Sequence, residues 1–427
     1  LALTTGDNNT FIGSYSGVTQ TTADNNTGVG KSVLAANTSG AGNTAVGMQA
    51  LDANTTASNN TAIGLNSLTA NTTGADNTAV GRTSMESNTE GDNNVAVGLD
   101  ALAANTTADN NTAVGYASLA ANTTGAGNTS VGKDALKANT TGAENVAVGI
   151  FALKTNTSAA KNTAMGYAAL CSNTTGAENT AVGAASMITN TTGAANVAMG
   201  FCAMKFNTEG ASNTAVGTVA LCKNTTGDSN VAFGSGALRN NTTADHNTAV
   251  GYLALTTSTT GCCNVAMGYN ALGNMTTTCC NTAIGPNTGT SVTTGIANTM
   301  IGSRAGCTTT TGDRNVFLGE ATGSHGTGLT TGDTNTYIGY AIQPSAADVS
   351  CELVINARGN ASQGKGTRTA FIDVQGNVFQ GNNATAWAQT SDRRIKKNIV
   401  DNTIGLDKIN QINKNDLLKK KIEKGEF

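Results

Sequence analysis

The sequence predicts an all-β fold, a parallel β-solenoid or β-roll, from three observations. The pentapeptide Asn-Thr-Ala-Val-Gly recurs along the chain, and its glycine keeps a constant period of 17 from Gly13 to Gly319, then reappears after a slightly longer interval at Gly339. In each repeat a β-branched, a small and an apolar residue follow one another, which is typical of a short strand. An Asn-Thr-Thr-Gly run is typical of a turn. So regular a period indicates stacked coils, because the repeat is too short for a helix and two strands.

The composition excludes several other classes of protein. The chain has 52 Gly but only 2 Pro, and glycine does not recur at every third residue, so it is not collagen. No run approaches the ~18 apolar residues of a transmembrane helix. A net charge of −3 with 38% hydrophobic residues argues against charge-driven disorder.

We number the repeat from its first asparagine, so that the glycine is position 5. Position 2 is always Thr or Val, position 4 is always apolar, and position 9 is Leu or Met in fifteen successive repeats from Leu34 to Leu272. Position 12 is Asn in thirteen repeats from Asn37 to Asn241. At a rise of ~4.8 Å per coil, nineteen coils would make a rod on the order of 90 Å long.

The asparagines of position 1 are expected to form a ladder of amide hydrogen bonds from coil to coil, and the glycines are expected to permit a bend that a side chain would obstruct. The ladder is predicted at Asn43, Asn60, Asn77, Asn94 and Asn111, and the bends at Gly47, Gly64, Gly81, Gly98 and Gly115.

The asparagines of position 12 have two interpretations. They are turn residues, or they are N-glycan acceptors in a chain that passes through a glycosylating secretory route, since many lie in Asn-x-Ser/Thr sequons. The candidate glycan sites are Asn54, Asn71, Asn105, Asn122 and Asn139.

Strand alternation places positions 2 and 4 on one face and the alanines of position 3 on the other. We expect the apolar residue of position 4 to form a narrow core with position 9, and the alanines to let neighbouring chains approach closely in a homotrimer. The alanine column turns bulky only near its ends, at Phe11, Met300, Phe317 and Tyr337, which would close an axis shared between chains.

Four of the nine cysteines are paired one period apart, Cys262 with Cys279 and Cys263 with Cys280. A stacking distance of ~4.8 Å lies within the Cα separation that a disulfide needs. Vertical disulfides, free thiols and a metal site are the interpretations, although neither a metal nor a cofactor is predicted.

The period suggests three segments: a solenoid shaft over residues 1–340, a β-hairpin shoulder over 341–390 and a basic segment with partly helical spacing over 391–427. Strands are expected at 352–356 and 369–374, followed by a turn at 375–377. The lysines at 419–421 are interpreted as a solvated helix face, so no nucleic-acid partner and no membrane insertion are predicted.

The repeat resembles that in the heads of trimeric bacterial autotransporter adhesins, over roughly residues 1–340. The resemblance implies left-handed parallel β-rolls with three chains side by side.

The stretch from Ser391 to Ile399, Ser-Asp-Arg-Arg-Ile-Lys-Lys-Asn-Ile, followed by Gly-Leu-Asp-Lys-Ile from Gly405, resembles the start of the self-cleaving intramolecular chaperone of phage endosialidase tailspikes and related viral fibres. The resemblance implies a Ser391–Lys396 dyad that cuts once between Thr390 and Ser391. Chemically, a serine nucleophile needs a base, and lysine serves only when burial keeps it neutral. Because the sequence continues only to Phe427, we expect a truncated chaperone remnant.

These observations favour a structural fibre, namely a homotrimeric shaft of a viral tail fibre or other extracellular fibre that attaches to a host surface glycan or receptor. Single-turnover autoproteolysis is the only enzymatic activity expected. The alternatives are a bacterial adhesin head and an ice-binding solenoid, the latter based on a threonine column at position 13 from Thr38 to Thr259.

Overall fold

The computed structural model describes residues 5–374, and these form a parallel β-solenoid that contains no helix. The chain divides into two units, Leu1–Gln375 and Gly376–Phe427, and the described residues all belong to the first. The expected helical segment after residue 390 lies outside the described residues.

Each coil contributes one short strand to a single sheet of 22 strands, and β21 and β23 form a separate pair. The strands are β1 (Thr10–Ile12), β2 (Thr27–Val29), β3 (Thr44–Val46), β4 (Thr61–Ile63), β5 (Thr78–Val80), β6 (Val95–Val97), β7 (Thr112–Val114), β8 (Thr129–Val131), β9 (Val146–Val148), β10 (Thr163–Met165), β11 (Thr180–Val182), β12 (Val197–Met199), β13 (Thr214–Val216), β14 (Val231–Phe233), β15 (Thr248–Val250), β16 (Val265–Met267), β17 (Thr282–Ile284), β18 (Thr299–Ile301), β19 (Val316–Leu318), β20 (Thr336–Gly339), β21 (Ile342–Gln343), β22 (Leu353–Asn356), β23 (Ser362–Gln363) and β24 (Ala370–Asp373).

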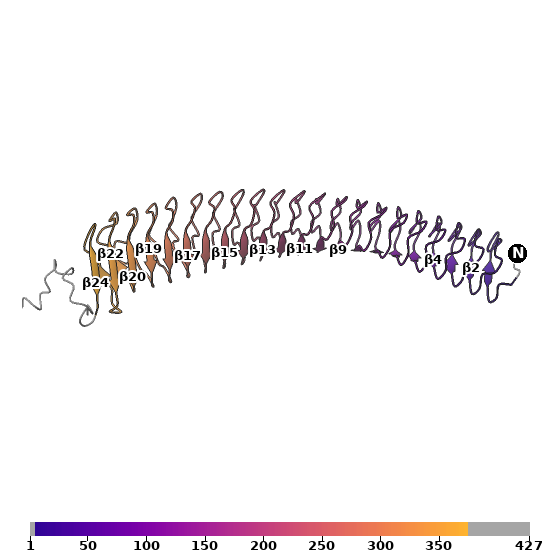
Figure 1. The fold of residues 1–427 in the computed structure, drawn as a ribbon, viewed down its shortest axis with the longest axis horizontal. Helices are drawn as coiled ribbons and strands as arrows, with labels where there is room; N and C mark the ends of the chain where they lie inside the picture. The colour runs from indigo at the N-terminus through magenta and orange to yellow at the C-terminus, as the bar shows by residue number, and fades with distance from the viewer. Residues whose placement is uncertain (1–4, 375–427) are drawn as a thin grey trace, which may run out of the picture. The chain divides into compact units, whose positions relative to one another are not determined.

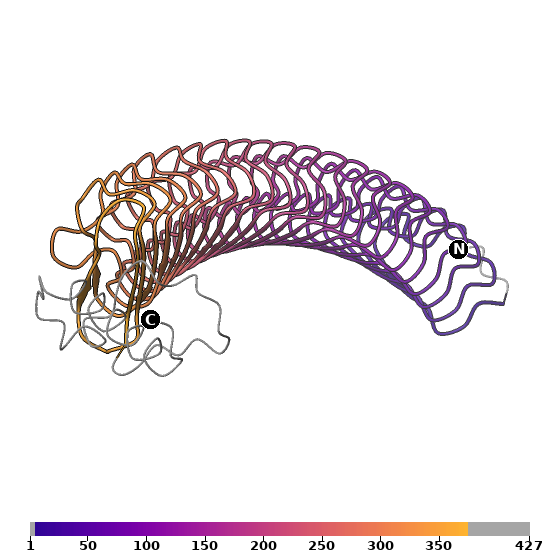
Figure 2. The same ribbon diagram turned by 60° about the vertical axis from the view of Figure 1, so that its left-hand side comes forward.

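Consecutive strands of the large sheet pair in parallel and in register, one repeat apart. Thr44 pairs with Thr61 and Ala45 with Ala62, for example. The spacing widens only between β19 and β20, where Val316 pairs with Thr336 because the intervening turn is longer. The coils stack in a curved row with their strands side by side (Figures 1 and 2), so the predicted solenoid is confirmed.

The solenoid continues past residue 340, where a change of architecture was expected. Strand β22 pairs in parallel with β20, and β24 pairs in parallel with β22, so that Thr336, Leu353 and Ala370 follow one another at the period of the repeat. Glu352 replaces the asparagine of position 1 and is buried, with a carboxylate oxygen that accepts the Tyr337 hydroxyl at 2.8 Å. Burial and this hydrogen bond raise the pKa of Tyr337. The predicted turn at 375–377 lies outside the described residues.

The two faces of the strand are the reverse of those expected. The position 3 alanines, such as Ala45 and Ala62, are fully buried, whereas Val46 and Ile63 at position 4 point outward and are more than a third exposed. The core consists of position 3 with positions 8 and 9, for example Ala45, Ala50 and Leu51. The physical reason is space, because so short a coil encloses a narrow interior that accepts a methyl group opposite leucine but not a second large side chain.

The bends that close each coil use left-handed backbone at large apolar residues. Leu51 has φ of 52° and Leu102 has φ of 54°, although both side chains are completely buried. A non-glycine residue in this region costs about 1–2 kcal/mol, and burying a leucine side chain contributes about 1.5–3 kcal/mol. The free energy gained by burying the leucine side chain therefore outweighs the cost of its left-handed backbone, so one residue both forms the bend and fills the core.

The bulky residues at the ends of the alanine column fill the interior of this chain rather than an axis between chains. Met300, Phe317 and Tyr337 are fully buried within their own coils. In the coils of Met300 and Phe317, position 9 is glycine instead of leucine, at Gly306 and Gly323. A Cβ on Gly306 would lie 2.8 Å from the Met300 sulfur and 3.0 Å from the Phe317 ring. The large side chain has moved from position 9 to position 3, so the filled volume is maintained.

Candidate interaction surface

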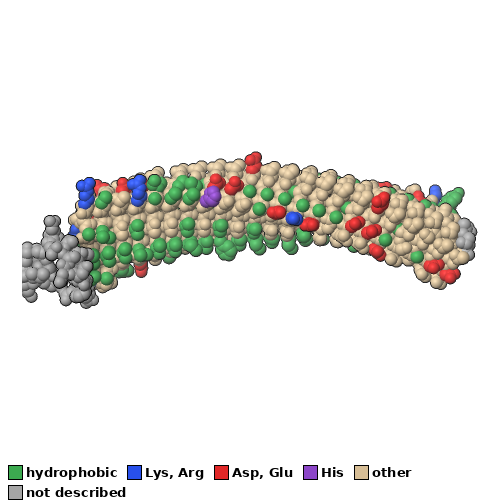
Figure 3. All heavy atoms as spheres, in the orientation of Figure 1, with side chains coloured by type: hydrophobic (Ala, Val, Ile, Leu, Met, Phe, Trp, Pro, Cys, Tyr) green, Lys and Arg blue, Asp and Glu red, His purple; other side chains and the backbone are tan. Residues whose placement is uncertain are grey.

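One outward face of the solenoid is apolar along its whole length. We call it the apolar strip and define it as the residues of position 4 together with the large apolar residues of position 6. Its most exposed members at position 4 are Ile12, Val46, Ile63, Val97, Val131, Met165, Met199, Phe233, Met267, Ile284 and Leu318. At position 6 they are Met48, Leu65, Tyr116, Ile150, Tyr167, Phe201, Tyr252, Tyr269 and Tyr340. Figure 3 shows hydrophobic side chains gathered along the lower edge of the solenoid in its left-hand and middle parts.

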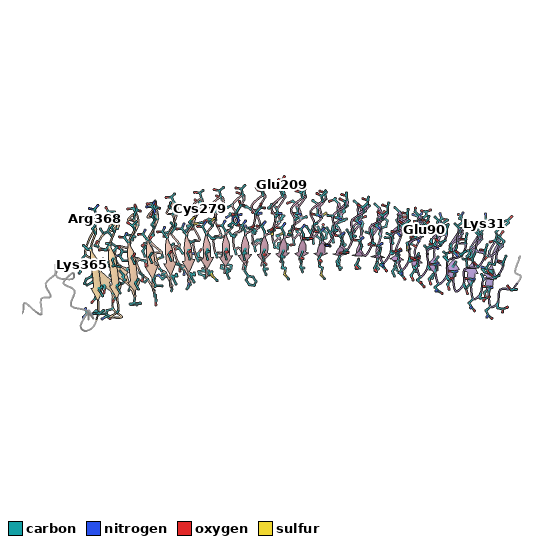
Figure 4. All side chains as sticks on the ribbon, viewed as in Figure 1. Lys31, Glu90, Glu209, Cys279, Lys365 and Arg368 are labelled. Carbon is teal, nitrogen blue, oxygen red and sulfur yellow. The ribbon has the colours of Figure 1, made fainter. Side chains whose placement is uncertain are left out.

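Charged residues are absent from the strand positions of this face and rare at position 6. Positions 2 and 4 carry no charged residue in any of the twenty repeats from Thr10 to Ile338. Position 6 is charged at four places: Lys31, Arg82, Lys133 and Glu320. Other acidic side chains, such as Glu90 and Glu209, lie along the opposite edge (Figure 4). Depletion of charge on an exposed apolar patch of this length is typical of an interaction surface.

Aromatic side chains form local platforms within the strip. The rings of Tyr252 and Tyr269, on successive coils, stack with centroids 5.9 Å apart and an interplanar angle of 11°. The Lys133 ammonium lies 5.9 Å from the centroid of the Tyr116 ring. Because each ring is about half exposed, these platforms present flat apolar area to a partner.

Two ladders of buried asparagines run inside the solenoid. At position 1, the Asn60 N–H donates to Asn43 Oδ1 at 2.9 Å, and Asn43 Nδ2 donates to the Ala57 carbonyl at 2.9 Å. The bond from the backbone N–H to the preceding Oδ1 recurs at Asn77, Asn94 and Asn111. At position 12, Asn71 Nδ2 donates to Asn54 Oδ1 at 3.1 Å. Each amide therefore joins two coils and satisfies backbone groups that the turns leave unpaired.

The candidate glycan sites all belong to the second ladder. Asn54, Asn71, Asn105, Asn122 and Asn139 are completely buried, and every one of their amide nitrogens donates two hydrogen bonds. A glycan on these nitrogens is incompatible with the folded coil, because it would have to leave through the packed turn.

The glycines of position 5 all have positive φ, including 133° at Gly47, 143° at Gly64, 140° at Gly81, 138° at Gly98 and 132° at Gly115. A Cβ on any of these glycines would lie within 2.7 Å of the carbonyl oxygen of the next glycine. The bend therefore requires glycine on two counts, the dihedral angle and the close approach of successive coils.

The hydroxyls of the threonine column proposed for ice binding form hydrogen bonds between successive coils of the solenoid. The Thr38 hydroxyl donates to the Thr55 carbonyl at 3.1 Å, and the same bond joins Thr55 to Thr72. These hydroxyl hydrogens are therefore donated to the neighbouring coil rather than to an ice surface.

Of the four paired cysteines, Cys262 and Cys279 face each other with their sulfur atoms 2.8 Å apart. Cys263 and Cys280 are exposed, and all nine cysteines are free thiols. Within residues 5–374, no group of three or more His, Cys, Asp or Glu residues is placed to hold a metal. No helix in this range is long and apolar enough to cross a membrane. Thr390, Ser391 and Lys396 lie outside the described residues.

The sequence interpretation missed the apolar strip because it placed position 4 in the core. A signal was present at position 6, where exposed tyrosines and phenylalanines recur next to position 4 without any strand pattern to bury them. The chain matches no protein-family model, and no curated protein matches it. The fold and this surface define a class, that of β-solenoid repeat proteins with one continuous apolar face.

Proposed function

We propose that the chain is the shaft of a homotrimeric β-solenoid fibre at a virion or other extracellular surface, where it serves attachment. The observation that carries this proposal is the apolar strip, which extends along the solenoid with no charge at position 2 or 4. A soluble monomer rarely exposes so long an apolar face, so a partner that covers it is expected.

A second copy of this chain is the partner that fits best. An identical solenoid repeats its side chains at the same coil spacing, so two strips stay matched over their full length, whereas an unrelated surface would soon lose register. About twenty coils at ~4.8 Å, with two columns about 10 Å wide, give roughly 900 Å² per chain. In a trimer each chain divides this area between its two neighbours, so roughly 450 Å² per chain faces each neighbour, less than the ~800 Å² per partner of a standard two-chain interface. The trimer therefore depends on its three contacts together.

The number of chains and the biological setting rest on the resemblances noted above. Both the adhesin heads and the viral fibres with C-terminal chaperones are trimeric, and a bacterial adhesin head remains the alternative setting. A rod that presents repeated outward loops would bind a host glycan or receptor through many weak contacts, which gain strength from multivalency.

The proposed assembly can be tested by its mass in solution. Sedimentation equilibrium of the wild-type chain is expected to give three times the mass of the single chain in the sample, which is 42.6 kDa before any cleavage. The triple variant Met165→Glu, Met199→Glu, Phe233→Glu is expected to sediment at the mass of one chain at micromolar concentration, because each carboxylate would be buried unpaired against the partner. Its circular dichroism should be unchanged, since all three side chains point outward.

A matched control adds the same charge elsewhere on the surface. Position 14 already holds glutamate at Glu90 and Glu209, so Thr141→Glu, Thr175→Glu and Thr226→Glu should leave the trimer intact. A wild-type monomer, or equal loss of trimer in both triple variants, would contradict the assignment of the strip.

Self-cleavage predicts a separate result. Intact-mass analysis of the freshly produced chain should show loss of residues 391–427, whereas Ser391→Ala and Lys396→Ala should remain whole. Lys397→Ala is the matched control and should be cut like the wild type. Identical uncut masses for all four proteins would refute the dyad without affecting the proposed shaft.

A further inference from the structure

The ladder of position 12 ends abruptly within the solenoid. Asn241 Nδ2 still donates to Asn224 Oδ1 at 2.8 Å, but the next position 12 residue is Ser258 and the one after it is Met275. Asn241 Oδ1 and the Ser258 hydroxyl are buried without a hydrogen-bond partner. The coils of β15 and β16 therefore lack the position 12 amide bonds that tie the preceding coils together, although the position 1 ladder continues through them.

The backbone bond of position 13 is kept between these coils and is lost one coil later. The position 13 bond is present from Thr242 to Thr259 (2.9 Å) and from Thr259 to Thr276 (2.8 Å), but no such bond joins Thr276 to Thr293 in the described structure. The turn side of the coils of β15 and β16 thus keeps its backbone bond but lacks the position 12 amide bond of the preceding coils.

Cys262 and Cys279, whose thiols face each other, lie on the coils of β15 and β16. Cys262 and Cys279 occupy position 16 on the coils of β15 and β16, and the Cys262 N–H donates to the Cys279 sulfur at 3.1 Å. The sulfur atoms, 2.8 Å apart, need to approach by less than ~1 Å to reach the ~2.05 Å of a disulfide. The hydrogen bond with Cys279, followed by burial, raises the pKa of Cys262 to about 12, so Cys262 is a thiol at neutral pH.

We propose that Cys262 and Cys279 form a reversible disulfide that staples the coils of β15 and β16 where the asparagine ladder has ended. Cys263 and Cys280 are not joined to each other in this proposal. The inference does not depend on the fibre function, and Figure 4 places Cys279 on the edge opposite the strands, away from the apolar strip.

The chemistry is thiol–disulfide exchange with a small disulfide such as oxidised glutathione. One cysteine, as its thiolate, attacks a glutathione sulfur, forms a mixed disulfide and releases one glutathione. The second, after losing its proton, attacks the sulfur of the first cysteine and releases the other glutathione. The protein loses two electrons and two protons, and the oxidant is reduced to two thiols. The bond closes a loop of one repeat, and this closure restricts opening of the two coils.

Equilibration of the full chain with oxidised and reduced glutathione tests the proposal. After alkylation of free thiols, peptide mapping should show Cys262 linked to Cys279, with the loss of two hydrogens. Hydrogen exchange over residues 273–280 should slow by about tenfold on oxidation, whereas exchange over residues 154–171 should not change.

The chain itself offers conservative control variants. Ser58 occupies position 16 in another coil and accepts the Ala41 N–H at 3.0 Å, so Cys279→Ser should fold normally but form no link and show no slowing. Cys263→Ala with Cys280→Ala should keep both the link and the slowing. A link between Cys263 and Cys280, a link between adjacent cysteines, the absence of any link, or unchanged exchange in the linked protein would overturn the proposal.

Discussion

Replacing Gly132 by alanine is expected to destabilise its region of the solenoid by about 3–5 kcal/mol. Gly132 is the position 5 glycine after β8, with φ of 134°, and a Cβ there would lie 2.6 Å from the carbonyl oxygen of Gly149 and 2.7 Å from its carbon. Both atoms belong to the backbone of the next coil, so they cannot move aside without breaking the parallel pairing. A lower midpoint in guanidinium unfolding, followed by circular dichroism, would measure this loss.

The preceding repeat offers a control for the effect of removing a glycine. Gly127 at position 17 has φ of 69°, and a Cβ there would meet no atom closer than 3.8 Å. Asn59, Asn93 and Asn110 occupy the equivalent position with similar φ, so Gly127→Asn should unfold at nearly the wild-type midpoint. Equal midpoints for Gly132→Ala and Gly127→Asn would show that close coil approach does not limit stability.

Replacing Asn145 by alanine is expected to cost about 3 kcal/mol, because it leaves several buried groups unpaired at once. Asn145 Nδ2 donates to the Ala159 carbonyl at 2.9 Å, and Asn145 Oδ1 accepts the Asn162 N–H at 3.0 Å. The loss should be local, since each coil of a solenoid contacts only its neighbours. Hydrogen exchange of peptides from residues 129–162 should therefore accelerate, while exchange near residue 60 should not.

An exposed asparagine serves as the comparison. Asn110 at position 17 points into solvent, and Gly42 and Gly127 occupy the equivalent position in other coils. Asn110→Gly should leave exchange unchanged. If Asn145→Ala exchanged as slowly as Asn110→Gly, the ladder would contribute nothing measurable to the stack.

Much of the architecture could be predicted because the repeats can be compared within one chain. The constant spacing from Gly13 to Gly319 indicated parallel strands in register, and the restriction of position 2 to Thr or Val located the strand itself. The asparagine column of position 1 suggested coil-to-coil amide bonds, and the cysteines one period apart suggested facing thiols.

The orientation of the strand could not be obtained in the same way. Alternation separates position 3 from positions 2 and 4, but it does not say which set faces inward. Leu51 and Leu102 hold left-handed backbone although leucine has no preference for it, so no turn signal marked these corners. The continuation through β22 and β24 was missed because Glu352 replaces asparagine and the pentapeptide is lost, while the period of the repeat persists.

The sequence by itself determined the period and hence the parallel stack, because a repeat of constant length brings equivalent residues of successive coils together. Only the tertiary structure decided which column forms the core and which forms the apolar strip. That choice depends on the space inside one short coil, which left-handed bends narrow until only a small residue fits opposite leucine, alanine in most coils and Ser130 in one. The valine column consequently faces outward, and the surface proposed to join the chains is position 4 rather than position 3.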